Sequence, residues 1–449
     1  MSHQTTFRVP EPYRVEGGEL VTNFHPGQWK ALNSIARFIV VLAGTQGGKT
    51  SFGPFWLLEE IAAKGPGDYL VVTPTYPLLK LKALPVFLNL FKTILGLGDY
   101  QKADKVFSFD AVGENRLWGG EQETPTRIIF GHAQDPESLE SATAKAAWLD
   151  EAGQNKFKLS SYEAIIRRLS LAQGRILITT TPYNLGWLKQ LLWDNRATDP
   201  DIDVIRFDST ENPAFPVEEM DRIKRMVADG RYPEWKFKMF YKAIFTRPAG
   251  MIYDNFDDER NRTSPFTVPD DWPRYLGLDF GGVNTAGVFL AHQPHTDNYY
   301  LYREYLTGGR TAEEHAIALL AGEDKTPICY GGAKSEGQWR MEFDKGGLTV
   351  NEPPVSDVEV GINRAYALVP NLYIFSTCSG ILDEFGTYAR ELDDMGEPTE
   401  KIADKETFHR LDALRYIASH LIADPVIGMV QGRVRGRGGR SIKRRATRR

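Results

Sequence analysis

The feature that most constrains the fold is a glycine-rich segment between an apolar run and a helical pattern. The apolar run, Phe38 to Leu42, has the β-branched and aromatic content of a buried strand. In a P-loop, a strand leads through such a segment into a helix, and backbone N–H groups bind phosphates at the helix N-terminus. The sequence therefore predicts a phosphate-binding α/β domain with a parallel sheet. The segment reads Ala43-Gly44-Thr45-Gln46-Gly47-Gly48-Lys49-Thr50.

Two side chains at the end of this motif have defined roles in P-loop chemistry. Lys49 is placed to reach the β- and γ-phosphates of ATP, and Thr50 is placed to ligate Mg²⁺. Ala43 stands where the motif usually has its first glycine. Residues 43–50 are therefore expected to bind ATP together with Mg²⁺.

A P-loop ATPase also needs carboxylates at the end of a distant strand. The apolar run 146–149 ends on Asp150 and Glu151. Asp150 is expected to hold Mg²⁺, and Glu151 is expected to activate the attacking water. Acidic pairs after a strand are also common helix N-caps. The presence of the P-loop in the same chain favours the catalytic interpretation.

Two further segments fit an ATP site less specifically. Gln28 precedes the P-loop by about twenty residues, and its amide could donate to and accept from adenine. Alternatively, Gln28 could cap a helix. The apolar run 175–180 ends in Thr179 and Thr180, and Thr181 follows directly. These hydroxyls could sense the γ-phosphate and couple hydrolysis to movement, or they could simply fill a strand.

The first half alternates apolar runs with longer helical patterns, as parallel strands with crossover helices do. The segment 246–269 then breaks this alternation with several prolines and a charged stretch, which indicates a linker. We predict four parts: a P-loop ATPase domain (1–245), a linker (246–269), a second α/β domain (270–424) and a basic disordered tail (425–449).

The second α/β domain has its own pattern of elements. Three consecutive apolar runs, 275–279, 286–291 and 299–305, predict sequential antiparallel strands. A helix over about 311–320, a fourth strand near Ile328 and further helices follow, the last one over about 405–421. This order resembles a ribonuclease H-like nuclease domain.

Two acids of this domain are candidates for a metal site. Asp279 ends the first apolar run, and Asp412 lies on the last helix beside Arg415. Cleavage of a phosphodiester by two metal ions needs such carboxylates to converge. The alternatives are an Asp that opens a turn and a helical salt bridge. Mg²⁺ or Mn²⁺ suits these oxygen ligands, whereas the histidines lack zinc-site spacing.

The order of these motifs resembles the large subunit of phage terminases over about residues 20–425. In that family the strand-end Asp and the helical D-A-L-R-Y segment are metal ligands of the nuclease. The family often has another Asp after the fourth strand, where this chain has Gly331 and Gly332. Glu336 is our tentative choice for this middle ligand, and Asp357 is the other candidate.

The resemblance also leaves one cation of the ATPase unassigned. The family carries an Arg within the P-loop or shortly before the acidic pair, but this P-loop has Gln46 instead. Lys145, Arg167 and Arg168 are candidates, and a neighbouring subunit could supply the cation.

The resemblance implies ATP-driven translocation of double-stranded DNA into a procapsid and metal-dependent endonuclease cutting. It also implies a portal protein, a small terminase subunit and a homo-oligomeric ring as partners, with the protein in the host cytoplasm and transiently docked on the procapsid. One alternative is a P-loop helicase or DNA-remodelling ATPase whose second domain binds nucleic acid without cutting. Another is a structural capsid component, which would need none of the ATPase residues.

Composition sets the remaining expectations. The formal net charge of the 449 residues is -5, but residues 425–449 contain basic side chains and no Asp or Glu. This tail is expected either to contact DNA phosphates or an acidic partner, or to act only as a solubilising segment. No apolar run is long enough for a membrane span. Two cysteines are too few for a disulfide framework, as expected in a reducing cytoplasm.

Overall fold

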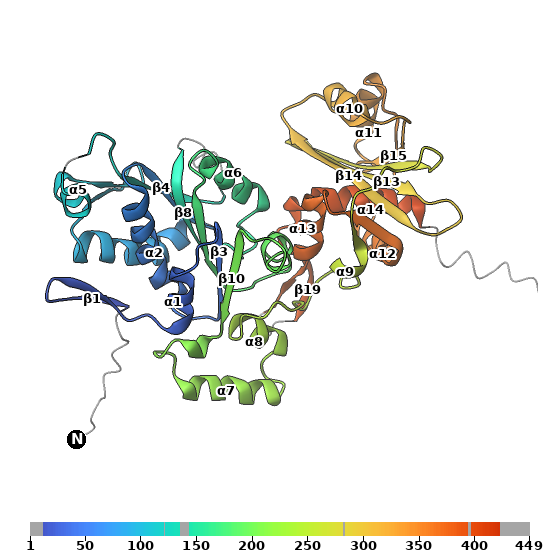
Figure 1. Ribbon diagram of the computed structural model, residues 1–449. Helices are drawn as coiled ribbons and strands as arrows, with labels where there is room; N and C mark the ends of the chain where they lie inside the picture. Colours follow the sequence, from blue (N-terminus) through green and yellow to red (C-terminus); the bar gives the residue numbers. More distant parts are fainter. Residues whose placement is uncertain (1–11, 121, 135–142, 282, 394–396, 423–449) are drawn as a thin grey trace, which may run out of the picture.

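The computed structural model describes residues 12–120, 122–134, 143–281, 283–393 and 397–422. Figure 1 shows two α/β bodies side by side, the first coloured blue to green and the second yellow to red. Each body is built on one large β-sheet. The predicted α/β fold class is confirmed, and the predicted basic tail lies outside the described residues.

The first sheet has eight strands in the order β10-β3-β9-β8-β4-β7-β6-β5. Strands β10 through β7 are parallel neighbours, whereas β6 and β5 are antiparallel. The parallel part places the carboxyl ends of β3, β8 and β9 at one edge of the sheet. The strands are β3 (Phe38–Ala43), β4 (Asp68–Thr73), β5 (Gly98–Gln101), β6 (Val106–Phe109), β7 (Arg127–His132), β8 (Ala144–Asp150), β9 (Arg175–Thr180) and β10 (Ile202–Phe207).

Helices cover both faces of this sheet. Successive side chains of a strand point to opposite faces, and in this sheet the side chains on both faces are apolar and buried. Val41 packs in a core with α2, and its neighbour Val40 packs in a second core with α6. A separate hairpin, β1 (Tyr13–Glu16) and β2 (Glu19–Thr22), precedes the sheet. The helical segments are α1 (Pro26–Leu32), α2 (Lys49–Lys64), α3 (Tyr76–Leu78), η1 (Leu79–Ala83), α4 (Leu84–Leu88), η2 (Asn89–Ile94), α5 (Ala111–Trp118), α6 (Leu159–Leu169), η4 (Leu188–Trp193), η5 (Ser209–Glu211), α7 (Val217–Ala228) and α8 (Glu234–Phe240).

The second sheet has seven strands in the order β11-β17-β14-β13-β12-β15-β16. The predicted antiparallel run of three strands is confirmed, since β13 pairs antiparallel with both β12 and β14. The fourth predicted strand, β15, runs parallel to β12. The strands are β11 (Arg262–Thr263), β12 (Arg274–Phe280), β13 (Asn284–His292), β14 (Tyr299–Gly308), β15 (Ile328–Gly331), β16 (Val350–Asn351) and β17 (Leu372–Phe375). A small hairpin, β18 (Arg390–Leu392) and β19 (Pro398–Ile402), lies apart from this sheet.

Figure 1 shows α10 and α11 on one side of the second sheet and α12, α13 and α14 on the other. The last helix, predicted over about 405–421, begins at His409, and a 3-10 turn, η7, precedes it. α14 lies against β12 so closely that a Cβ on Gly277 would overlap the carbonyl oxygen of Ala413. The helices of this body are α9 (Asp258–Asn261), α10 (Ala312–Leu320), α11 (Gly337–Lys345), α12 (Val358–Leu368), η6 (Val369–Asn371), α13 (Ser379–Thr387), η7 (Lys405–Thr407) and α14 (His409–Leu421).

The segment predicted as a linker, 246–269, makes specific contacts with the second body. It contains α9 and β11, and β11 pairs with β17 at the sheet edge. Ile252, Tyr253 and Phe256 belong to the core beneath the second sheet. We propose that the second domain begins near residue 250. The ends predicted for the ATPase domain, at 245, and for the second domain, at 424, stay proposals.

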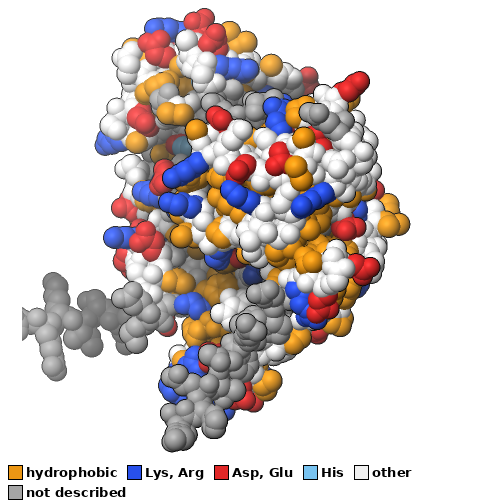
Figure 2. Space-filling view, turned by 90° about the vertical axis from the view of Figure 1, so that its left-hand side faces the viewer, with side chains coloured by type: hydrophobic (Ala, Val, Ile, Leu, Met, Phe, Trp, Pro, Cys, Tyr) orange, Lys and Arg blue, Asp and Glu red, His pale blue; other side chains and the backbone are white. Residues whose placement is uncertain are grey.

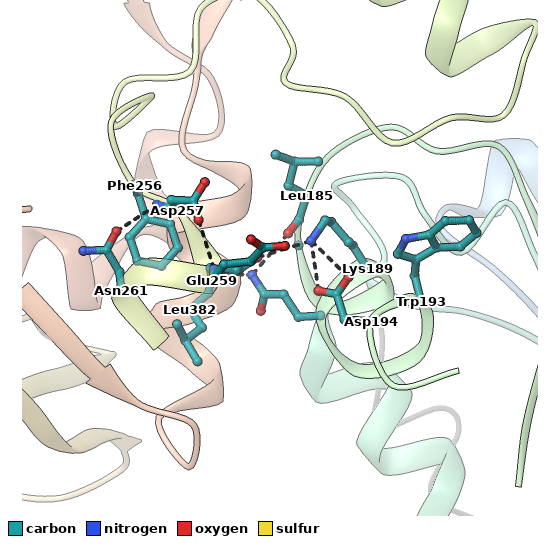
Figure 3. Close-up of polar contacts among 12 residues, drawn as sticks. Leu185, Lys189, Trp193, Asp194, Phe256, Asp257, Glu259, Asn261 and Leu382 are labelled. Atoms are coloured by element: carbon teal, nitrogen blue, oxygen red, sulfur yellow. Dashed lines mark hydrogen bonds and ion pairs between the residues drawn. The ribbon is translucent and has the colours of Figure 1, made fainter. Parts of the chain in front are cut away.

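The two bodies meet where the segment after β9 contacts α13. Leu185 donates its N–H to the carbonyl of Gly386 at 3.0 Å, and the Gln190 side-chain amide donates to the carbonyl of Leu382 at 2.7 Å. Lys189 pairs with Asp258 at 3.4 Å, and Figure 3 shows Lys189 between Asp194 of the first body and the segment of Phe256 and Asp257. Backbone, side-chain and ionic contacts therefore all fix this junction.

Charged side chains of both signs lie on the face that Figure 2 shows. On the face in Figure 2, lysine and arginine side chains lie among acidic ones and hydrophobic side chains. Among the described residues, no helix combines the length and apolar character that crossing a bilayer requires. Cys329 and Cys378 are both buried and free.

We expect Gly386→Ala to weaken the junction, because its new Cβ would overlap the carbonyl oxygen of Leu185. Such overpacking against backbone costs about 1–3 kcal/mol. Small-angle scattering should detect a larger radius of gyration, and limited proteolysis should cut between the bodies faster. Gly337→Ala is the matched control, because a Cβ there meets nothing closer than 3.9 Å. Equal scattering and proteolysis for both variants would contradict the prediction.

The junction should also respond to pH through Asp383, whose Oδ1 accepts the N–H of Trp187 at 2.6 Å. Burial raises the pKa of this carboxyl from 3.8 to about 6, although Trp187, Lys158 and Arg410 act in the opposite direction. A raised pKa gives stability that is present below the unfolded pKa and is lost as pH rises through about 6.

Asp383→Asn should therefore remove a pH dependence of up to about 3 kcal/mol between pH ~4 and ~7. The substituted amide oxygen can still accept the N–H of Trp187. The measurement is the free energy of unfolding of both proteins across this range. An unchanged pH profile in the variant would show that Asp383 does not titrate at the junction.

Candidate functional site

The glycine-rich loop curves around the first turn of α2. Gly48 is the N-cap of α2, with φ of 83°, a conformation that side chains other than glycine rarely adopt. A Cβ on Gly48 would come within 2.9 Å of the Gln28 amide nitrogen, and one on Gly47 within 2.9 Å of the carbonyl oxygen of Gly44. The first N–H groups of a helix have no acceptor within the helix, and the first residues of α2 line a pocket, which suits phosphate binding. The pocket is lined by Thr45, Gln46, Gly47, Gly48, Lys49, Thr50, Ser51, Leu81, Lys82, Pro85, Val86, Glu151 and Asn212.

The predicted magnesium ligands lie together at the carboxyl edge of the sheet. The Thr50 hydroxyl is 3.2 Å from Asp150 Oδ1, and the Thr179 hydroxyl donates to the same oxygen at 2.8 Å. Asp150 stands beside Thr179 because β8 and β9 pair in parallel register there. Burial and the neighbouring Glu151 charge raise the pKa of Asp150. A divalent cation next to Thr50 and Asp150 would favour the ionised carboxylate, so this donor set fits Mg²⁺.

The predicted general base, Glu151, is buried and holds three polar partners. Lys49 and Lys82 each place an ammonium nitrogen 3.6 Å from its Oε1. The Tyr183 hydroxyl donates to its Oε2 at 2.9 Å. The backbone of Glu151 has φ of 58°, so the residue sits in a left-handed turn after β8. This turn directs the carboxylate toward the P-loop.

The remaining predicted residues of the ATP site lie close to this centre. Gln28 donates from Nε2 to the carbonyl of Gly48 at 2.9 Å and accepts the N–H of His25 through Oε1. Its amide therefore supports the P-loop and caps α1 in this structure, while adenine contact stays a prediction. The Thr180 hydroxyl accepts the N–H of Gly153 at 2.9 Å and donates to the carbonyl of Thr181.

The cation candidates from the sequence lie away from this pocket. Lys145 is at the opposite end of β8 from Asp150, roughly 16 Å along the strand by rise per residue. Its ammonium group donates to the carbonyl of Lys64 at 2.8 Å. Arg167 and Arg168 lie in the last turn of α6. Lys82, which the sequence interpretation missed, is the cation beside Glu151 together with Lys49.

The two predicted nuclease acids are close enough to influence each other. Burial raises the pKa of Asp412, as does the charge of Asp279, while Arg415 acts in the opposite direction. Asp412 Oδ1 accepts from Arg415 Nη2 at 3.0 Å, and Asp279 Oδ2 lies 3.0 Å from His409 Nδ1. The hydrogen bond to Asp279 raises the pKa of His409. His409 of α14 therefore contacts the strand-end acid directly, and Asp412 lies near enough to be influenced by its charge.

The candidates for the middle ligand have local roles. Glu336 Oε2 accepts the N–H of Ala333 at 2.5 Å, in the turn that follows β15. Asp357 caps α12 by accepting the N–H of Val360 at 2.9 Å. Among the described residues, no three His, Cys, Asp or Glu side chains are grouped to hold a metal ion. Metal ligation by Asp279, Asp412 and Glu336 therefore stays a prediction.

The chain is similar to solved structures of phage large terminases. It is 18% identical to the large terminase of a thermophilic bacteriophage, covering 89% of this chain and 99% of that one, with a TM-score of 0.43. For the HK97 bacteriophage large terminase the identity is 14%, the coverage 89% and 95%, and the TM-score 0.45. The P22 large terminase nuclease domain is 22% identical to this chain. The match covers 38% of this chain and 91% of that domain, with a TM-score of 0.31. No family model and no curated protein matches the chain.

Proposed function

We propose that the protein is the large subunit of a phage terminase, which translocates double-stranded DNA with ATP and cuts it with bound metal ions. The observation that carries this proposal is the convergence of Lys49, Thr50, Asp150 and Glu151 at one sheet edge. A separate α/β body with paired acids supports the second activity.

ATP hydrolysis follows from the roles of four side chains. Lys49 would bind the β- and γ-phosphates, while Thr50 and Asp150 would hold Mg²⁺, which would neutralise charge on the phosphates. Glu151 accepts a proton from the attacking water. For this role its carboxylate must exchange its lysine partners for water, because Lys49 and Lys82 both lie 3.6 Å from Oε1.

DNA cutting is assigned to the acids of the second body. Asp279 and Asp412 would hold Mg²⁺ or Mn²⁺, and such ions activate water and neutralise the developing charge on phosphate. Two nearby carboxylates repel each other, which makes this place favourable for a cation. Glu336 is proposed as a third ligand through Oε1, because its Oε2 accepts the N–H of Ala333.

The partners and location belong to the same proposal. We propose that the protein acts as a homo-oligomeric ring on a portal protein, with a small terminase subunit and double-stranded DNA. It would work in the host cytoplasm, transiently docked on the procapsid. Thr179, Thr180 and Thr181 would couple hydrolysis to movement, because this segment leads directly to the contact with α13.

A second candidate function is a DNA-remodelling ATPase or helicase whose second body binds nucleic acid without cutting. The observation that favours it is the lack of a third converging acid among the described residues. Cleavage of plasmid DNA with Mn²⁺ present separates the two functions.

We expect Lys49→Ala to abolish ATP turnover, since it removes the cation that binds the phosphates. Glu151→Gln should still bind ATP but lower turnover by about 100- to 10,000-fold, the usual contribution of a general base. Turnover of labelled ATP and equilibrium binding by calorimetry give the two readouts. Circular dichroism of each variant checks that the fold is intact. Wild-type turnover in either variant would refute the ATP site.

We expect Asp279→Asn and Asp412→Asn each to lower plasmid cleavage in Mn²⁺ by about 100-fold or more, because metal ions contribute several kcal/mol to this chemistry. ATP turnover should survive in both, since these acids belong to the other body. Asp297→Asn, an exposed acid in the turn after β13, is the matched control. Full cleavage by either active-site variant would remove that acid from the site.

A further inference from the structure

Lys82 lies across the nucleotide pocket from the P-loop. Its ammonium nitrogen is 3.6 Å from Glu151 Oε1, the same oxygen that Lys49 approaches at 3.6 Å. The two lysines come from different elements, Lys49 from the start of α2 and Lys82 from η1 after β4. Two cations therefore converge on one point between the P-loop and the acidic strand end.

The position of Lys82 is fixed by its backbone, although its side chain reaches solvent. Leu79 and Ala83 of the same helical turn are fully buried in the core. The Lys82 side chain is 48% exposed, compared with 7% for Lys49. Lys82 therefore stands at the mouth of the pocket on a rigid support, and Lys49 stands at its base.

We propose that Lys82 binds the γ-phosphate of ATP from the same subunit and makes the site prefer ATP over ADP. This role rests on the proposed ATPase function. Lys49 must neutralise charge on both the β- and γ-phosphates, so a second cation beside the γ-phosphate has a defined electrostatic task. When ATP enters, the γ-phosphate takes the place of Glu151 as the partner of Lys82. With ADP, Lys82 stays on Glu151.

The test is the affinity of the full chain for Mg²⁺-ATPγS and Mg²⁺-ADP, measured by calorimetry. Lys82→Ala should weaken ATPγS binding about tenfold and leave ADP binding within about twofold, as expected from loss of one charge-assisted contact. Lys82→Arg should keep most of the preference for ATPγS, because its guanidinium also binds phosphate. Lys80→Ala is the matched control, because Lys80 is exposed on the same turn but does not line the pocket.

A second experiment distinguishes two roles of Lys82: binding of the γ-phosphate, and neutralisation of the Glu151 charge without phosphate contact. If Lys82 contacts the γ-phosphate, its removal should still weaken ATPγS binding in a Glu151→Gln background, although by a different factor, because Lys82 and Glu151 are in contact. Disappearance of the loss in that background would overturn the proposal, as would equal weakening of ADP and ATPγS. If the wild-type chain binds neither nucleotide, the proposed ATPase function itself fails. If it binds both but Lys82→Ala changes nothing, only the role of Lys82 fails.

Discussion

Two adjacent carboxylates are buried at the carboxyl end of β8, and the first body is arranged around their charge. Asp150 is 1% exposed and Glu151 3% exposed. A buried carboxylate costs several kcal/mol unless hydrogen bonds or cations compensate it. Asp150 is compensated by two hydroxyls, and Glu151 by two lysines and the hydroxyl of Tyr183. These partners come from α2, η1, β9 and the segment after β9, so one electrostatic requirement fixes how four elements meet.

The same carboxylates connect the pocket to the second body through a short stretch of chain. Tyr183 donates to Glu151, and two residues later the backbone of Leu185 pairs with Gly386 of α13. A change at Glu151 therefore acts within a few residues of the junction. A rigid contact between the nucleotide pocket and α13 can transmit movement if the pocket and the junction can each adopt two conformations. The proposed exchange of Glu151 partners on ATP binding would give the pocket end two such conformations.

The sequence predicted those features that depend on local pattern. The P-loop, the acidic strand end and the antiparallel run of β12 to β14 follow from strand composition and turn residues. Lys82 and Tyr183 could not be predicted, because a single lysine or tyrosine carries no period or motif, and only the sheet order brings them to Glu151. The segment 246–269 was expected to be a linker from its prolines. Its apolar Ile252, Tyr253 and Phe256 are buried in the core of the second body, a contact that the prolines do not indicate.

The position of Asp412 on α14 depends on Glu384 of α13, and α13 is also the helix that contacts the first body. α14 has no side-chain cap of its own at Phe408, but Glu384 of α13 accepts the N–H groups of Arg410 and Leu411. This carboxylate fixes where α14 begins, and the helical repeat then sets which residues face Asp279. His409 contacts Asp279, and Asp412, three residues further along α14, lies near enough for the charge of Asp279 to raise its pKa. Because α13 carries Glu384 on one side and contacts Leu185 on the other, the geometry of the paired acids and the docking of the ATPase body share one helix.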